Sequence, residues 1–233
     1  METKDKRAKV RNIAARYSVA TVGLAFVAIG ISFAVQSNLG VSALNGVQYA
    51  CAVKYPRFSF GDFNFALFSL LILVQLAVLR KEFKLIDLLQ LVANAMLGYM
   101  ADGFVWILNH LGMVPGTLEL RFFYILVSCI VTAFGVSLEV AARAWMLPAE
   151  MTVNAFTRAF GGKFSNNKVI MDSTLLVISC ILCLVFWKNL LGPSEQPILG
   201  IGTLVSAVAV GLMMRLTDPL VQWLLRKLKV ESF

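Results

Sequence analysis

The sequence has little charge and a single histidine, and both shortages exclude whole classes of protein. Charged residues make up 15% of the 233 positions, whereas hydrophobic residues make up 59%. Soluble domains average about 25% charged and about 45–50% apolar residues, so this composition is typical of a membrane protein. His110 is the one histidine, which excludes histidine-based metal sites and histidine-dependent catalytic triads.

Sequence signatures of common enzymes are also missing. The chain contains no HExxH zinc motif, no GxSxG nucleophile elbow, no glycine-rich phosphate loop and no Cys/His metal pattern. We therefore expect no catalytic residue, no cofactor and no metal. The four cysteines, Cys51, Cys129, Cys180 and Cys183, lie in or beside apolar segments, where we expect them to pack.

Six apolar segments are long enough to cross a membrane, because about 20 residues span a hydrocarbon core of about 30 Å. They are residues 17–36, 60–79, 86–109, 120–142, 169–190 and 198–225. The first segment follows a basic stretch, but it is long and has no small-residue cleavage site. A retained span is therefore expected in place of a removed signal peptide.

Basic residues gather on one side of this predicted topology. They precede the first span, join spans two and three at Arg80, Lys81 and Lys84, and follow the sixth span. The positive-inside rule then places both termini in the cytoplasm. The net charge of +8 is thus explained by topology and by anionic membrane lipids, and no nucleic-acid partner is expected.

The two halves of the chain share an ordered set of short matches. "GIS" at Gly30 matches "GVS" at Gly135, and "SALNGVQ" from Ser42 aligns with "PAEMTVN" from Pro148. This order indicates a duplication, and two copies with three spans each insert with opposite orientations. The sequence therefore predicts an all-α membrane protein of six transmembrane helices in two inverted three-helix repeats. The predicted divisions are a basic N-terminal segment 1–16, a first repeat 17–112, a second repeat 113–226 and a cytoplasmic tail 227–233.

A short helix is predicted after the first span of each repeat, at residues 42–54 and 148–160. About 13 residues make a helix of about 20 Å, which is too short to cross. Ser42 is a candidate N-cap, Pro148 suits a first helical turn, and Glu150 suits the positive end of the helix dipole. Each helix either lies flat at the interface, with Glu150 capping its own amides, or enters the bundle as a re-entrant element. We favour the re-entrant arrangement, with both helix N-termini meeting near the pseudo-twofold axis.

Polar residues in or beside the apolar segments are the candidate binding residues. Several pairs are four residues apart and so share a helix face, as Glu150 and Asn154 do. Asp102 is an isolated acid within a span, where an ionised side chain costs at least about 2.5–3.5 kcal/mol and needs a partner or water. The predicted substrate- or ion-binding set is Ser42, Asn45, Gln48, Asp102, Glu139, Arg143, Glu150, Asn154, Lys168 and Asp172.

Some of these polar residues have an alternative structural interpretation. Lys168 and Asp172 either form an interfacial salt bridge or line the cavity. Gln90, Asn94 and Gly98 form one stripe along the third span. That stripe predicts a helix-packing face of small and polar residues, with a pathway lining as the alternative.

Several blocks of the sequence resemble the YczE/YyaS/YitT group of bacterial multipass membrane proteins. They are "QSNLGVSALNG", "SFGDFNF", "DLLQLVANAMLGYMAD", "LPAEMTVNAF", "KVIMDSTLLVIS" and "GIGTLVSAVAVG". The sequence departs from the group at Ala43 and Leu44, where a proline more usually follows "LGVS". The resemblance implies six helices in a bacterial cytoplasmic membrane, and it suggests transport without naming a substrate.

Together these features predict a small transporter, with its site between the two repeats, for a small polar or charged solute. A mixed-charge lining suits a zwitterion or an organic anion. The alternatives are a passive channel for a small solute or ion, a membrane subunit or regulator, and a small membrane enzyme using Glu139 and Glu150. The expected partners are membrane lipids and the solute, with a homodimer or an unknown membrane partner left open. ATP-driven transport would need another chain, because no Walker motif is present.

Overall fold

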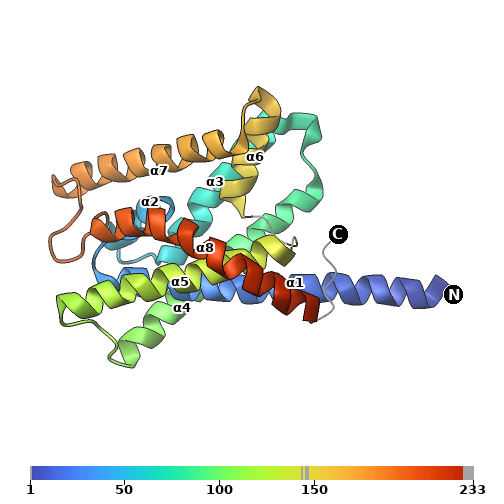
Figure 1. The fold of residues 1–233 in the computed structure, drawn as a ribbon. Coiled ribbons are helices and arrows are strands. Elements are labelled where there is room, and N and C mark those ends of the chain that lie inside the picture. The colour runs from blue at the N-terminus through green and yellow to red at the C-terminus, as the bar shows by residue number, and fades with distance from the viewer. Residues whose placement is uncertain (1, 143, 145–146, 228–233) are drawn as a thin grey trace.

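The long helices of the structure match the predicted spans. The computed structural model describes residues 2–142, 144 and 147–227, and within these ranges it is helical with no strand (Figure 1). Six helices are long and apolar enough to cross a membrane. They are α1 (Glu2–Ser37), α3 (Phe60–Leu79), α4 (Leu89–His110), α5 (Leu118–Ala142), α7 (Phe164–Trp187) and α8 (Ile201–Lys227). The predicted all-α fold with six spans is confirmed.

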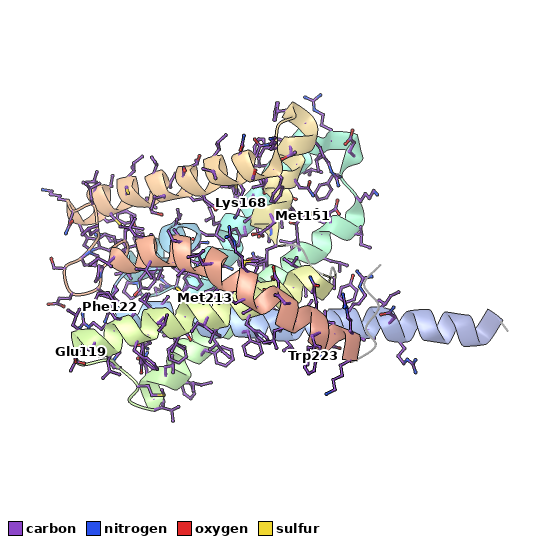
Figure 2. All side chains as sticks on the ribbon, viewed as in Figure 1. Glu119, Phe122, Met151, Lys168, Met213 and Trp223 are labelled. Atoms are coloured by element: carbon purple, nitrogen blue, oxygen red, sulfur yellow. The ribbon has the colours of Figure 1, made fainter. Side chains whose placement is uncertain are left out.

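The outer surface of the bundle is apolar, as a lipid environment requires. Large side chains such as Val185, Leu216 and Trp223 are between 57% and 70% exposed. Phe122 and Trp223 point away from the bundle near its two ends (Figure 2). Water would not tolerate so large an exposed apolar area, whereas lipid chains cover it at no cost.

Helices α1 and α5 pack closely in antiparallel directions. Arg16 donates from Nε to the Ala142 carbonyl, and Ser128 near the other end of α5 donates to the Gly30 carbonyl. Between these contacts, a Cβ atom placed on Gly135 would lie 2.6 Å from the Gly23 carbonyl oxygen. Glycine at Gly23 and Gly135 therefore lets the two backbones touch, as small residues do in membrane helix pairs.

The two short helices lie inside the bundle, near opposite ends of it (Figure 1). The first is preceded by a 3-10 turn, η1 (Ala43–Asn45), so that α2 covers Gly46–Lys54 and is shorter than predicted. The second, α6 (Pro148–Phe160), matches its predicted range, with Pro148 and Glu150 in the first turn. Each begins among buried residues and ends exposed, at Lys54 and Phe160. Neither is long enough to cross a membrane.

Loops and caps hold these helices in position. Helix α3 begins with a capping box, in which Ser59 and Asp62 each accept a hydrogen bond from the other's backbone N–H. The α3–α4 connection contains two 3-10 turns, η2 (Arg80–Glu82) and η3 (Leu85–Leu88). The loop before η1 bonds to the loop before α8, because the Val41 N–H donates to the Ile198 carbonyl at 3.0 Å. Ser42 precedes η1, but its side chain makes no capping hydrogen bond.

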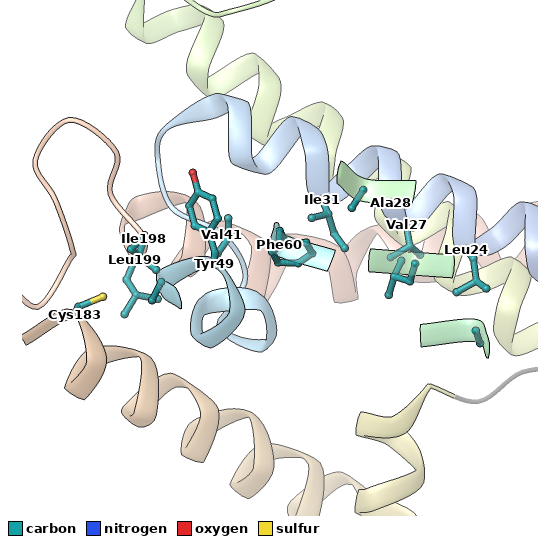
Figure 3. Close-up of a cluster of buried hydrophobic side chains, with 14 residues drawn as sticks. Leu24, Val27, Ala28, Ile31, Val41, Tyr49, Phe60, Cys183, Ile198 and Leu199 are labelled. Atoms are coloured by element: carbon teal, nitrogen blue, oxygen red, sulfur yellow. The ribbon is translucent and has the colours of Figure 1, made fainter. Parts of the chain in front are cut away.

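The short helices pack against the long helices in a reciprocal pattern. Helix α2, from the first half of the chain, contacts α7 and α3, and α6, from the second half, contacts α3 and α7. A buried apolar cluster joins α1, α2, α3 and α7, with Leu24, Tyr49, Phe60 and Cys183 among its members (Figure 3). Cys183 thus packs in the core, as predicted.

One pair of long helices breaks this reciprocity. Helix α1 packs along α4 as its counterpart α5 packs along α8, and α3 also packs along α4. In the described part of the chain, α7 has no comparable contact along α8. The α3–α4 pair is therefore closed, which means that its two helices are in contact, whereas the equivalent α7–α8 pair is separated.

The α1–α5 crossing gives a stability prediction. We expect Gly135→Ala to destabilise the folded protein by about 1–3 kcal/mol, because the added methyl group would meet the Gly23 carbonyl and the Val27 backbone nitrogen at 2.6 and 2.7 Å. The measurement is the thermal unfolding midpoint in detergent. The matched control is Gly211→Ala in α8, where a Cβ atom meets nothing within 4 Å. An equal midpoint for both variants would contradict a tight crossing.

Candidate functional site

A first layer of buried amide side chains attaches α2 to α3 and α4. Asn64 donates from Nδ2 to Asn94 Oδ1 at 2.7 Å, and Gln48 donates from Nε2 to Asn64 Oδ1 at 3.4 Å. All three side chains are at most 1% exposed. Beside this layer, Gly98 lies against the Gly61 backbone. Asn94 and Gly98 therefore belong to a helix-packing face, as the stripe on the third span predicts.

A second amide layer attaches α6 to the same two helices. Gln75 and Gln90 exchange hydrogen bonds through their side-chain amides, at 3.2 and 3.0 Å. Gln75 Nε2 also lies 3.0 Å from the Pro148 carbonyl oxygen and 3.0 Å from Thr152 Oγ1. Gln75 is completely buried. The first turn of α6 is thus held in the bundle interior by one side chain from the other half of the protein.

The two layers separate the beginnings of the short helices. Their attachment points on α3, Asn64 and Gln75, are eleven residues apart, which is about 16 Å along a helix. Each helix N-terminus is therefore attached to the α3–α4 pair at its own level. Direct contact between the two N-termini stays a prediction.

A charged cluster lies on the other face of α6, toward α7. Lys168 Nζ is 2.9 Å from Asp172 Oδ1 and 3.6 Å from Glu150 Oε1. Lys168 lies on the side of α7 that faces α6, because its ammonium group reaches Glu150 of that helix (Figure 2). The predicted Lys168–Asp172 ion pair is confirmed, and Glu150 joins it. The cluster combines three charged side chains from two helices, with α6 holding one carboxylate.

Glu139 places a further carboxylate near this cluster. It lies in the last turns of α5 and is 8% exposed. Its side chain lies against α1 at Gly23, where a Cβ atom would come within 2.9 Å of Glu139 Cγ. The charge of Glu150 is close enough to act on it electrostatically. Two acidic side chains from different helices therefore share one buried region.

Unpartnered oxygen atoms concentrate on these residues. Within the described ranges, five buried side-chain polar atoms have no hydrogen-bond partner. Three of the five are Gln48 Oε1, Glu139 Oε1 and Glu150 Oε2, all from predicted site residues. A buried acceptor without a donor costs about 1–3 kcal/mol, more for a charged group. The interior is thus short of hydrogen-bond donors, and a donor-bearing ligand or a proton would satisfy it.

The other predicted residues lie elsewhere. Asp102 Oδ2 accepts the Gly61 N–H at 2.9 Å and so caps α3; it also lines an outer cavity of about 310 Å³ with Tyr49 and Gln196. Ser42 and Asn45 flank the 3-10 turn before α2, outside the charged cluster. Asn154 is half-buried on α6, one turn beyond Glu150. Arg143 lies outside the described residues.

Three residues of the amide layers, Asn64, Gln75 and Thr152, belong neither to the predicted binding set nor to the predicted stripe on the third span. Gln75 interrupts an otherwise apolar stretch of the second span, and a lone amide in a span often bonds to another helix. That signal identifies a polar contact but does not identify its partners. No group of three metal-ligating side chains occurs in the part of the chain that the structure describes.

The Gln75 layer gives a second stability prediction. We expect Gln75→Leu to lower the thermal unfolding midpoint, because it leaves the Pro148 carbonyl and Gln90 without their buried partner, at about 1–3 kcal/mol for each unsatisfied group. The matched control is Gln222→Leu on α8, an exposed glutamine, which should leave the midpoint close to that of the parent. Equal midpoints for the two variants would show that the layer contributes nothing to stability.

Comparison with known proteins identifies one family. Residues 14–219 match a family described as a family of unknown function, DUF6198. No curated protein and no solved structure matches the chain. The matched range extends from α1 into α8 and so includes all six long helices. The chain therefore belongs to the DUF6198 family.

Proposed function

We propose that this protein is a small secondary transporter that moves a solute with a positively charged group, of which a zwitterion is the best candidate. The observation that carries the proposal is the set of buried, unpartnered oxygens on Gln48, Glu139 and Glu150. Among the described charged residues of the region, three acids, Glu139, Glu150 and Asp172, outnumber two cations, Lys168 and Arg16, and Arg16 bonds to the Ala142 carbonyl. An ammonium group supplies both the missing donors and the missing charge, which favours a zwitterion over an organic anion.

An inverted-repeat architecture supports this proposal. The two short helices make reciprocal contacts, α2 on α7 and α6 on α3. The first helices of the two halves, α1 and α5, are antiparallel, as copies of opposite orientation would be. Transporters built from inverted repeats bind their solutes between the repeats, at interrupted or short helices. The resemblance to the YczE/YyaS/YitT group points in the same direction.

The difference between the two halves supports a carrier. Helix α3 is closed on α4, whereas α7 is separated from α8. In an inverted-repeat carrier, one half adopts a conformation that the other half adopts in the opposite-facing state. Exchange of these two arrangements would expose the Glu150 region first to one side and then to the other.

The distribution of basic residues supports cytoplasmic termini in a bacterial cytoplasmic membrane. The first half of α1, the 3-10 turn η2, the beginning of α7 and the end of α8 lie near one end of the bundle (Figure 1), and these segments include or adjoin Arg16, Arg80, Lys163 and Arg226. The opposite end has fewer basic residues, such as Lys54 and Lys188. By the positive-inside rule the more basic end, which also contains the exposed end of α6, faces the cytoplasm.

The direct test of the proposal is solute uptake by proteoliposomes. Labelled alanine, choline and succinate represent a zwitterion, a cation and a dianion. We expect uptake of alanine or choline, and we expect Glu150→Gln to reduce alanine uptake at least about tenfold, because a charge-assisted hydrogen bond from its ammonium group contributes about 1.5–3 kcal/mol. Glu119→Gln is the matched control, since Glu119 is exposed at the far end of the bundle (Figure 2).

The thermal midpoint of Glu150→Gln must match that of the parent for this comparison to report on transport. Uptake restricted to succinate, or unchanged alanine and choline uptake in Glu150→Gln, would contradict the proposed role of Glu150.

A second prediction distinguishes a carrier from a passive channel. A carrier that alternates between the two arrangements must show counterflow. Unlabelled solute inside the liposome binds the site, leaves on the outer face, and so makes the site available again to labelled solute outside. We expect labelled alanine or choline to enter faster when the liposomes contain the same unlabelled compound, with a rate that saturates. A rate that rises linearly with concentration and ignores internal solute would identify a channel.

A further inference from the structure

Glu139 has surroundings unlike those of the other acids near the charged cluster. Asp172 and Glu150 both lie within 4 Å of the Lys168 ammonium group. Glu139 has no such cation among the described residues, and its Oε1 atom has no donor. An ionised carboxylate in this position is costly in an apolar environment. The side chain is satisfied when it carries a proton or when a cationic ligand approaches it.

Among the described residues, no basic side chain pairs with the Glu139 carboxylate; Arg143, four residues further along the chain, lies outside them. On α1, Glu139 lies against Gly23, and Arg16 further along that helix donates from Nε to the Ala142 carbonyl. Glu150 on α6 and Asp218 on α8, which accepts a hydrogen bond from Ser137, add negative charge to its surroundings. Within the described ranges, the neighbouring helices thus give Glu139 no ion-pair partner.

The packing around Glu139 is compatible with its carrying a proton through a conformational change. Gly23 leaves room for the side chain at the α1–α5 crossing, because a Cβ atom there would clash with Glu139 Cγ. Glu139 and Glu150 lie on different helices, so a movement of α6 relative to α5 changes the distance between the two carboxylates. Both acids have an open acceptor, and a proton on one reduces the repulsion between them.

We propose that Glu139 is the proton site that couples solute movement to a proton gradient, by binding either a proton or the cationic group of the solute. This inference rests on the transport function proposed above. A proton binds Glu139 Oε1 from one side of the membrane and is released on the other side, where the solute's ammonium group takes its place and is carried back. Glu150, held by Lys168, binds solute but does not carry the proton.

The experiment separates exchange from accumulation in proteoliposomes. Counterflow of labelled alanine or choline needs no net proton movement, whereas accumulation driven by a pH gradient does. For one proton per solute, a gradient of one pH unit supports about tenfold accumulation. We expect Glu139→Gln to lose accumulation completely, so that the internal and external concentrations become equal, and to weaken counterflow as well, because glutamine neither binds the proton nor pairs with the solute's cationic group.

Two other variants provide the controls. Glu119→Gln should keep both activities, and Glu150→Gln should lose both. Accumulation that survives in Glu139→Gln would overturn the assignment while leaving the transport function intact. Accumulation in the parent that follows a sodium gradient and ignores the pH gradient would overturn proton coupling. Absence of any flux in the parent would remove the transport function itself.

A measurement on the parent protein covers the case in which Glu139→Gln does not fold. If a proton and the solute compete for Glu139, the apparent Kd for alanine or choline rises as the pH falls. Calorimetry in two buffers of different ionisation enthalpy should also detect proton release when the solute binds. An affinity independent of pH, with no proton release, would overturn the proposal.

Discussion

The hydrogen bonds of Gln75 are the constraint on which the interior of this protein depends. A polar group surrounded by apolar side chains and lipid has no water to bond, so each such group must find its partner inside the bundle. Gln75 bonds to Gln90 of its own helix pair and to Pro148 and Thr152 of α6. This one amide therefore attaches a short helix that cannot cross the membrane to two helices that can. Without that attachment, the buried first turn of α6 would have no defined position.

The position of α6 in turn determines the electrostatics of the region. Once α6 is attached to α3, its other face presents Glu150 to Lys168 of α7. The lysine is shared by two acids, and Glu139 on α5 adds a third acid that the lysine does not reach. The imbalance between acceptors and donors arises because the one ammonium group between α6 and α7 pairs with two acids and leaves the third acid, on α5, without it. It is also the property that makes the region suitable for a cationic group or a proton.

The difference between the α3–α4 and α7–α8 pairs has a related physical origin. Helix α3 is joined to α4 by two layers of amide hydrogen bonds and by the Gly61–Gly98 approach. Helix α7 carries no matching set of amides toward α8: its buried polar side chain Ser179 bonds to its own helix and lies against Gly46 of α2. The closed pair is thus held by specific bonds, whereas the separated pair is not. A pair without such bonds moves at lower cost than a pair that has them.

Local properties of the sequence determined the six spans and the start of α6. Hydropathy over about 20 residues identifies a span wherever it packs, and a proline in the first turn followed by an acid marks a helix start because both act on nearby backbone groups. The same local reasoning placed Lys168 with Asp172 and identified Glu139, Glu150 and Gln48 as candidates. Only the tertiary structure decided which of these residues meet. Gln75 reaches Thr152 across 77 positions of the sequence, Asp102 caps α3 instead of joining the charged cluster, and Glu139 has no ion-pair partner among the described residues. Such pairings depend on how separate helices pack. The spacing of residues in the sequence predicts which side chains share a face of one helix, but it does not predict which helix that face contacts.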